Sequence, residues 1–167
     1  GGEFSVAGGS VYFVGKDGRL YARPLGHHQP RAITPAYGGL ASPAVSPDRK
    51  WVAYVFSDGA TDVLAIVDSE GKTWPQKLTS GADFYMQPVW HPDGKRLAWI
   101  EWDHPAMPWD QTRLKMAVVT SKTFPKLEGI DQIAGESETV IQQPEFSPDG
   151  KYLSYISSNG NWDAIIL

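Results

Sequence analysis

The residues whose side chains are best suited to binding or catalysis in this 167-residue sequence lie in one stretch, Trp102 to Asp110, which reads WDHPAMPWD. It brings together two carboxylates, one imidazole and two indoles, carried by Trp102, Asp103, His104, Trp109 and Asp110. Two prolines limit the freedom of the chain here, which lowers the entropy lost when the stretch becomes ordered. Because Trp and Met are costly to expose to water, we expect this stretch to pack on its own fold or on an adjoining domain.

Two roles are open for the carboxylates of Asp103 and Asp110. Asp side chains commonly accept hydrogen bonds from backbone amides in turns, and such capping would be purely structural. Alternatively, the stretch lines an interface with another domain and shapes the entrance for a peptide, and its carboxylates meet a basic group of that partner.

Catalysis by a serine nucleophile of the hydrolase type needs Gly-x-Ser-x-Gly between a strand and a helix, because a strained turn must expose the Ser hydroxyl. The sequence contains no such pentapeptide and no stretch with helical periodicity over three turns. We therefore expect the chain itself to contain no catalytic residue.

The four histidines do not form a recognisable metal site. His27 and His28 are adjacent, so their side chains point apart, and a solvated loop is the favoured interpretation. His91 occupies the turn position that Ser46 and Ser147 take elsewhere, which indicates a role in turn formation. Zinc needs three or four converging ligands with familiar spacing, so we expect neither a metal site nor a bound cofactor.

Composition excludes several classes of partner. The formal charge is −4 and the sequence has no basic cluster, so no nucleic-acid partner is expected. No apolar run approaches the roughly 20 residues of a membrane span, so no membrane partner is expected. The absence of Cys excludes disulfides, Cys-ligated zinc and thiol catalysis, and it leaves the redox compartment open.

The elements that must position the Trp102–Asp110 stretch repeat along the chain. Four alternating runs share an aromatic third residue and a branched fourth residue: Val11–Val14, Val52–Val55, Leu97–Ile100 and Leu153–Ile156. Another apolar residue stands seven positions before each run: Phe4, Val45, Trp90 and Phe146. Three of the intervening turns read Ser-Pro-Asp-Arg, His-Pro-Asp-Gly and Ser-Pro-Asp-Gly, and the first uses Gly8 and Gly9 instead. Each unit therefore predicts a β-hairpin.

A third run follows each hairpin, and a shorter fourth run follows in the first three units, at 31–34, 76–79 and 130–134. Four short strands per unit of about 40 to 45 residues is the spacing of propeller blades. A β-sandwich is the alternative, but it gives no reason for turn chemistry at fixed offsets. We predict an all-β partial propeller of about four four-stranded antiparallel blades, at 3–34, 42–79, 87–134 and 143–167, with the last blade incomplete. We expect the chain to be a piece of a larger protein.

Strand order predicts which loops meet. In an antiparallel blade, the loop entering the first strand and the loop leaving the second lie at one end, and the Pro-Asp turn lies at the other. Asp83, Phe84 and Tyr85 precede the first strand of the third unit. We therefore expect them at the same end as Trp102–Asp110, and together with Trp102, Asp103, His104, Trp109 and Asp110 they form the candidate domain interface or substrate entrance.

These repeats resemble those of TolB-like (WD40-like) propellers. The whole chain resembles the N-terminal propeller of the prolyl oligopeptidase (S9) family of serine peptidases, of the acylaminoacyl-peptidase and dipeptidyl-aminopeptidase type. The residues that carry the resemblance are Gly1–Phe4, Val11–Phe13, Gly81–Tyr85, Trp102–Asp110 and Gln143–Gly150. Two positions depart from the expected pattern, Arg49 in place of Gly and Ala106 in place of a polar residue.

The resemblance implies a non-catalytic propeller segment that gates and orients peptide substrates for an α/β-hydrolase domain that is not in this chain. That domain would supply the Ser, His and Asp of a triad, without a cofactor. The implied partners are the hydrolase domain and peptide substrates, and unpaired strand edges favour self-association of the isolated piece. The alternative is a TolB-like propeller that acts as a protein-interaction module without enzyme activity.

Overall fold

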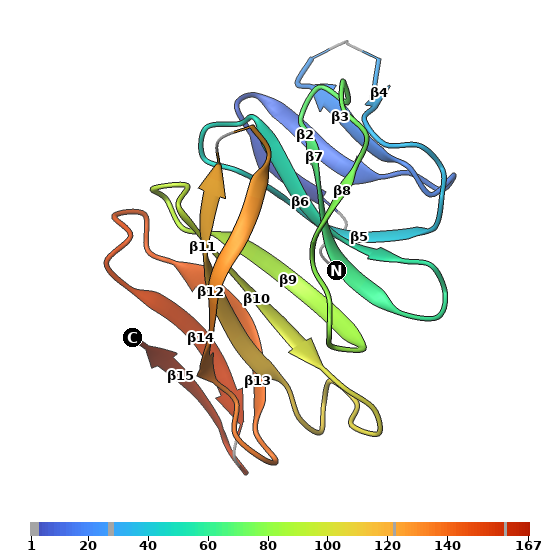
Figure 1. The fold of residues 1–167 in the computed structure, drawn as a ribbon. Coiled ribbons are helices and arrows are strands. Elements are labelled where there is room, and N and C mark those ends of the chain that lie inside the picture. Colours follow the sequence, from blue (N-terminus) through green and yellow to red (C-terminus); the bar gives the residue numbers. More distant parts are fainter. Residues whose placement is uncertain (1–3, 27–28, 122, 159) are drawn as a thin grey trace. The chain divides into compact units, whose positions relative to one another are not determined.

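A computed structural model of the protein describes residues 4–26, 29–121, 123–158 and 160–167 (Figure 1). Within them the regular structure is entirely β: β1 (Phe4–Ala7), β2 (Ser10–Val14), β3 (Leu20–Pro24), β4 (Arg31–Ala32), β5 (Gly39–Val45), β6 (Trp51–Ser57), β7 (Asp62–Asp68), β8 (Gln76–Thr79), β9 (Phe84–Trp90), β10 (Arg96–Trp102), β11 (Arg113–Ser121), β12 (Pro125–Ala134), β13 (Val140–Phe146), β14 (Leu153–Ser158) and β15 (Trp162–Ile166). Gly1–Glu3 and the histidines at 27 and 28 lie outside the described residues. None of the described residues belongs to a helix that could cross a membrane.

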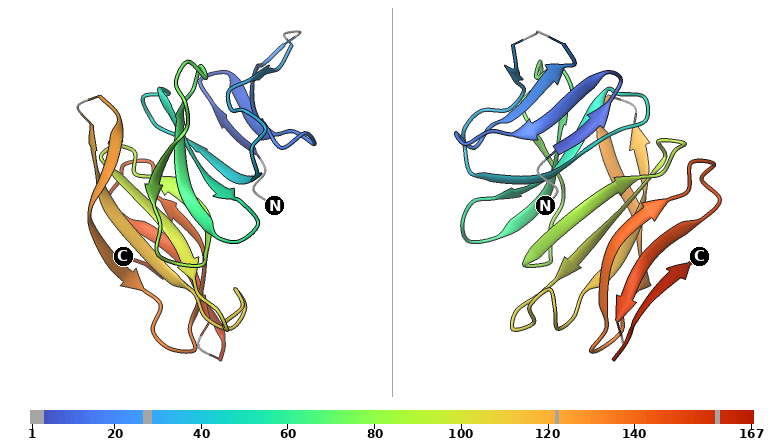
Figure 2. Two further views of the ribbon diagram at one scale, coloured as in Figure 1. Left: turned by 45° about the vertical axis from the view of Figure 1, so that its right-hand side comes forward. Right: turned by 180° about the vertical axis from the view of Figure 1, so that it is seen from behind.

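The strands form four antiparallel sheets in two compact units, Gly1–Gly81 and Ala82–Leu167. The first unit holds the sheets β1-β2-β3-β4 and β5-β6-β7-β8. The second holds the four-stranded sheet β12-β11-β10-β9 and the three-stranded sheet β13-β14-β15, whose strand order is visible from behind in Figure 2. The prediction of an all-β partial propeller with an incomplete last blade is confirmed.

The turns that contain Ser-Pro-Asp close their hairpins through hydrogen bonds of the Ser and Asp side chains. Ser147 Oγ accepts a hydrogen bond from the Tyr152 amide at 3.0 Å and donates one to Asp149 at 2.7 Å, and the Ser46 turn repeats this arrangement. The last turn residue has a positive φ each time, 70° at Gly94 and 71° at Gly150. Arg49 takes the same left-handed conformation with φ 62°, although this costs a non-glycine residue about 1 kcal/mol.

Each unit has its own hydrophobic core between two sheets. In the first unit, Tyr12 and Val14 of β2 pack against Val52 and Tyr54 of β6. In the second, Ala98 and Ile100 of β10 pack against Leu153 and Tyr155 of β14. In both cases the second and fourth residues of one alternating run meet the first and third residues of the next, so period-two alternation places one apolar set on each face.

Two outer strands differ from their predicted bounds: β4 covers only Arg31–Ala32 where 31–34 was expected, and β12 is longer than expected. The fourth strand of the third sheet was expected at 130–134, but β12 begins at Pro125 and pairs with β11 over most of its length, with two register shifts. Its added residues include the exposed Lys126 and Glu128. An outer strand needs few buried side chains, because the backbone ladder holds it, so hydrophobic alternation was a poor guide here.

His91 links two sheets in addition to forming its turn. Its Nδ1 accepts a hydrogen bond from the Asp93 amide at 3.1 Å, as a turn residue would. Its Nε2 lies 2.9 Å from the Gly150 carbonyl oxygen, and its ring meets that of Phe146 edge-on at 4.9 Å. The side chain is buried between the two turns.

His91→Ser is expected to destabilise the second unit by about 1 to 2 kcal/mol, because it preserves the turn but removes a buried hydrogen bond to the neighbouring sheet. Urea unfolding followed by circular dichroism measures the loss. The control is Ser147→Ala, which removes only hydrogen bonds within one exposed turn. Equal losses for the two variants would contradict a role of His91 between sheets.

Candidate functional site

The ladder between β9 and β10 fixes the position of the candidate site. Phe84 pairs with Trp102, and Tyr85 pairs with Glu101. The His91–Gly94 turn closes the opposite end of the same two strands. Asp83 and the Trp102–Asp110 loop therefore emerge side by side from one end of the sheet.

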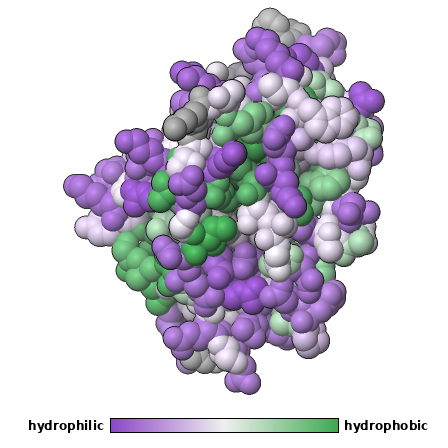
Figure 3. Space-filling view, viewed as in Figure 1, coloured by the Kyte–Doolittle hydropathy of each residue, from purple (hydrophilic) through white to green (hydrophobic). Residues whose placement is uncertain are grey.

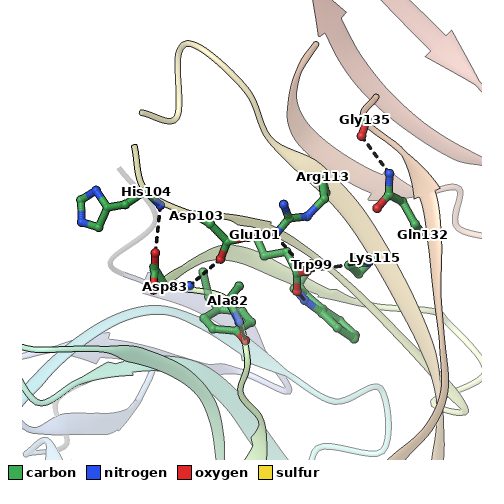
Figure 4. Close-up of polar contacts among 11 residues, drawn as sticks. Ala82, Asp83, Trp99, Glu101, Asp103, His104, Arg113, Lys115, Gln132 and Gly135 are labelled. Carbon is green, nitrogen blue, oxygen red and sulfur yellow. Dashed lines mark hydrogen bonds and ion pairs between the residues drawn. The ribbon is translucent and has the colours of Figure 1, made fainter. Parts of the chain in front are cut away.

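Two carboxylates lock the base of this loop by reciprocal hydrogen bonds (Figure 4). The Asp83 amide donates to Asp103 Oδ1 at 2.9 Å, and the His104 amide donates to Asp83 Oδ2 at 2.9 Å. The Asp103 carboxylate therefore caps a backbone amide, which is the first of the two roles considered for it, and the Asp83 carboxylate does the same. Each holds the backbone of the other segment, so the two segments are fixed as a pair.

Aromatic contacts form the second part of the base. The rings of Phe84 and Trp102 stack with centroids 5.1 Å apart, and the His104 ring meets Phe84 edge-on at 4.8 Å. Tyr85 lies on the opposite face of the strand from Phe84. Its side chain is buried, and its hydroxyl accepts a hydrogen bond from the Ala82 amide at 2.9 Å. Tyr85 thus belongs to the core, whereas Phe84, Trp102 and His104 form the surface.

Charged residues that the sequence analysis did not single out connect the loop to the sheet. Arg113 Nη2 lies 2.6 Å from Asp103 Oδ2 and 3.5 Å from Glu101 Oε1, and Lys115 Nζ lies 3.9 Å from Glu101 Oε1. Glu101 also accepts a hydrogen bond from Trp99 Nε1 at 2.8 Å (Figure 4). The register of β10 against β11 sets Glu101 opposite Arg113, so only that register could have indicated the pair from the sequence.

The contacts of this network shift the pKa values of Asp103 and Arg113. Burial raises the pKa of Asp103, but the hydrogen bonds from Arg113 and the Asp83 amide and the nearby positive charges outweigh it, so the pKa of Asp103 lies below its ordinary value. For Arg113, burial acts to lower the pKa, and the hydrogen bond and charge of Asp103 together with the charge of Glu101 raise it overall. Both groups are therefore held in their charged forms.

The tip of the loop is exposed, unlike its hydrogen-bonded base. Two turns shape it, with the Ala106 amide donating to the Asp103 carbonyl at 3.0 Å and the Met107 amide donating to Asp110 Oδ2 at 2.9 Å. Trp109 at the tip remains 67% exposed and Met107 38% exposed. Of the two partners expected for these apolar side chains, their own fold or an adjoining domain, the described residues do not cover Trp109.

Beside the loop lies a pocket of about 210 Å³. It is lined by Trp102, Asp103, His104, Pro105, Ala106, Gln111 and Arg113. The lining offers an indole, an amide, a guanidinium and a carboxylate, which suit contact with a peptide. Within the described parts of the chain, no three His, Asp or Glu side chains converge as ligands of a metal ion would.

No family model matches the chain. It is 38% identical over 52 residues to the Tol-Pal system protein TolB of Methylobacillus flagellatus, a match that covers 31% of this chain and 12% of that protein. Among solved structures, a puromycin hydrolase is 30% identical with a TM-score of 0.78, over 95% of this chain and 27% of that one. A puromycin-hydrolysing peptidase of Mycobacterium tuberculosis is 26% identical with a TM-score of 0.80, over 97% of this chain and 28% of that one.

The fold and these comparisons define a TolB-like β-propeller segment, similar to the propeller of prolyl oligopeptidase (S9) family peptidases. Two of the solved structures that are similar to the chain are puromycin-hydrolysing enzymes, at 26% and 30% identity. The chain spans less than a third of either enzyme and about an eighth of the TolB relative.

Proposed function

We propose that this chain is the non-catalytic propeller segment of a peptide hydrolase, and that the Trp102–Asp110 loop faces the hydrolase domain and borders the path of the substrate. The observation that carries the proposal is the contrast within the loop. Its base is fixed by Asp83, Asp103 and Arg113, whereas its tip presents an uncovered Trp109. A rigid loop with an exposed indole is suited to dock a second surface at low entropic cost.

In this proposal the hydrolase domain and the propeller segment have different roles. The hydrolase domain supplies the serine nucleophile. Its hydroxyl attacks the peptide carbonyl, the amine portion of the peptide leaves, and water then hydrolyses the acyl-serine ester. The loop and its pocket form a wall beside that site. Such a wall admits flexible peptides and excludes folded proteins, and it orients the peptides that enter.

The exposed indole provides the test. In the full-length protein that joins this chain to its hydrolase domain, Trp109→Ala is expected to lower kcat/KM for an aminoacyl anilide by roughly tenfold, which corresponds to about 1.4 kcal/mol of lost transition-state stabilisation. Trp74→Ala is the matched control, because Trp74 is 68% exposed in the other unit and Trp109 is 67% exposed. Equal rates for the wild type and Trp109→Ala would refute the role of the loop.

A second function is favoured by one observation, the curated match to TolB. In that case the propeller is a protein-interaction module without enzyme activity. The full-length coding sequence separates the two, because only a hydrolase contains Gly-x-Ser-x-Gly at a strand-to-helix turn. Its absence there would favour the interaction module.

A further inference from the structure

Three strands share an irregular residue in an otherwise extended backbone. Ser42 of β5, Gln87 of β9 and Gln143 of β13 have φ angles of 50°, 51° and 55°, although none of them is a glycine. A buried proline follows each of them directly. In all three ladders these two residues lie opposite a single residue of the next strand, so the register shifts by one and each pair forms a β-bulge.

Proline suits the second position of such a bulge. The extra residue of a bulge lacks a partner in the ladder, and proline has no backbone N–H that would need one. The first position is costly instead, because a left-handed backbone strains any residue that carries a Cβ. Strain of this kind persists only where the surroundings hold the residue in place.

In the third sheet the side chain of Gln87 provides such a hold. Its Oε1 accepts a hydrogen bond from the Gln143 amide at 2.7 Å, so the bulge of β9 contacts the bulge of β13. The net gain from one hydrogen bond is similar in size to the cost of one left-handed residue. Gln87 can therefore occupy a position whose backbone would favour glycine.

The bulge at Gln87 sets which side chains of β9 meet the Trp102–Asp110 loop. With the shift in register, Phe84 pairs with Trp102. Without it, the register that holds beyond the bulge would continue, and Tyr85 would stand opposite Trp102. Because side chains alternate along a strand, every residue of β9 before the bulge would then move to the other face of the sheet.

We propose that Gln87 is a positioning residue of the candidate site. Its left-handed bulge sets the register that brings Phe84 onto Trp102, and its hydrogen bond to Gln143 fastens that bulge to the next sheet. Gln87 acts through β9 and needs no contact with a substrate. The inference rests on the proposed function for what the site does, whereas the effect on register depends on the strands alone.

The test uses the full-length protein that contains this chain. Gln87→Val is the main variant, because a β-branched side chain strongly disfavours a positive φ. Gln87→Gly accepts the positive φ but lacks the acceptor for the Gln143 amide. Gln87→Glu keeps the length of the side chain and an acceptor oxygen. Ser42→Val is the matched control, because it makes a valine bulge at φ 50° in a sheet that does not carry the site.

Hydrogen exchange, resolved to single amides by fragmentation in the mass spectrometer, reports the state of the site. The Asp83 and His104 amides each donate to a carboxylate of the opposite segment, so their exchange rates show whether the two segments are joined. Figure 3 shows mainly hydrophilic side chains around the lower end of the second unit, where the loop lies, so water reaches this part of the surface. Hydrolysis of an aminoacyl anilide reports the use of the site.

Gln87→Val is expected to raise the exchange rates of the Asp83 and His104 amides roughly tenfold and to lower kcat/KM by about tenfold, because a shifted strand misplaces the loop. Gln87→Gly should raise the exchange rate of the Gln143 amide and leave the two site amides unchanged. Gln87→Glu should match the wild type at all three amides, and Ser42→Val should match it at the two site amides.

Wild-type exchange at the Asp83 and His104 amides in Gln87→Val would overturn the proposal, and so would an equal increase in Ser42→Val. If Gln87→Val does not fold, Gln87→Gly provides the test: faster exchange at the site amides, or an unchanged rate at the Gln143 amide, would contradict the role of the bulge. Faster exchange at the site amides of Gln87→Val with an unchanged kcat/KM would support the positioning role and refute the proposed function.

Discussion

Gly135→Ala is expected to destabilise the second unit by about 3 kcal/mol or more, because the substitution forces the backbone to move. Gly135 has φ +98°, a region that side chains with a Cβ rarely adopt. A Cβ at this position would clash with the Thr112 carbonyl oxygen and lie 2.7 Å from Arg113 Cα. Both neighbours are backbone atoms, so no rotation of a side chain can relieve the contact.

Gly129→Ala is the matched control for this experiment. Gly129 also has a positive φ, +62°, and a Cβ there would meet nothing within 4 Å. Its expected cost is about 1 kcal/mol, the conformational penalty alone. Urea unfolding measures both variants, and equal losses would show that the clash with Thr112 does not matter.

The close approach at Gly135 also bears on the candidate site. Gly135 touches the backbone of Thr112, which precedes β11, and of Arg113, which begins β11 and whose guanidinium holds Asp103. Thr112 is fully buried, and its hydroxyl donates to the Ile141 carbonyl at 2.7 Å, which ties β11 to β13. Gly135→Ala should therefore also loosen the loop, seen as faster hydrogen exchange at the His104 amide.

The sequence was informative where local chemistry decides the structure. Ser147, Pro148 and Asp149 form a turn through contacts within a few residues, so their order alone predicts the hairpin. Even Arg49, a departure from the glycine pattern, keeps the left-handed conformation, because the turn around it imposes one. The alternation of Leu97 to Ile100 likewise defined two faces without knowledge of their partners.

The sequence was less informative where the partner lies far along the chain. Trp102 and Trp109 are the same residue type in one loop, yet Trp102 stacks on Phe84 and Trp109 is exposed. The difference depends on the β9–β10 register and the turn at Met107, which the residue types do not specify. Arg113 was missed for the same reason: its partner Asp103 lies across the loop, and only pairing of β10 with β11 brings the two together.

Arg113→Met is expected to destabilise the second unit by about 2 kcal/mol, between the values for exposed and buried ion pairs. Met preserves much of the apolar stem and removes the charge. Glu101 then keeps Lys115 and Trp99 as partners, and Asp103 loses its 2.6 Å partner. The control is Lys151→Met, since the Lys151–Asp149 pair joins side chains that are 72% and 53% exposed. That variant should cost less than about 0.5 kcal/mol.

The pH dependence distinguishes loss of the ion pair from loss of packing. The pKa of Asp103 is lowered in the folded protein, so its stabilising contribution is present above the unfolded pKa of about 3.9 and is lost as pH falls through the lower folded value. In Arg113→Met the pKa of Asp103 should rise toward its ordinary value, which NMR titration of the carboxyl carbon measures. The stability difference between wild type and variant should then shrink below about pH 4. A difference that stays constant through this range would mean that Arg113 acts through the packing of its stem and not through its charge.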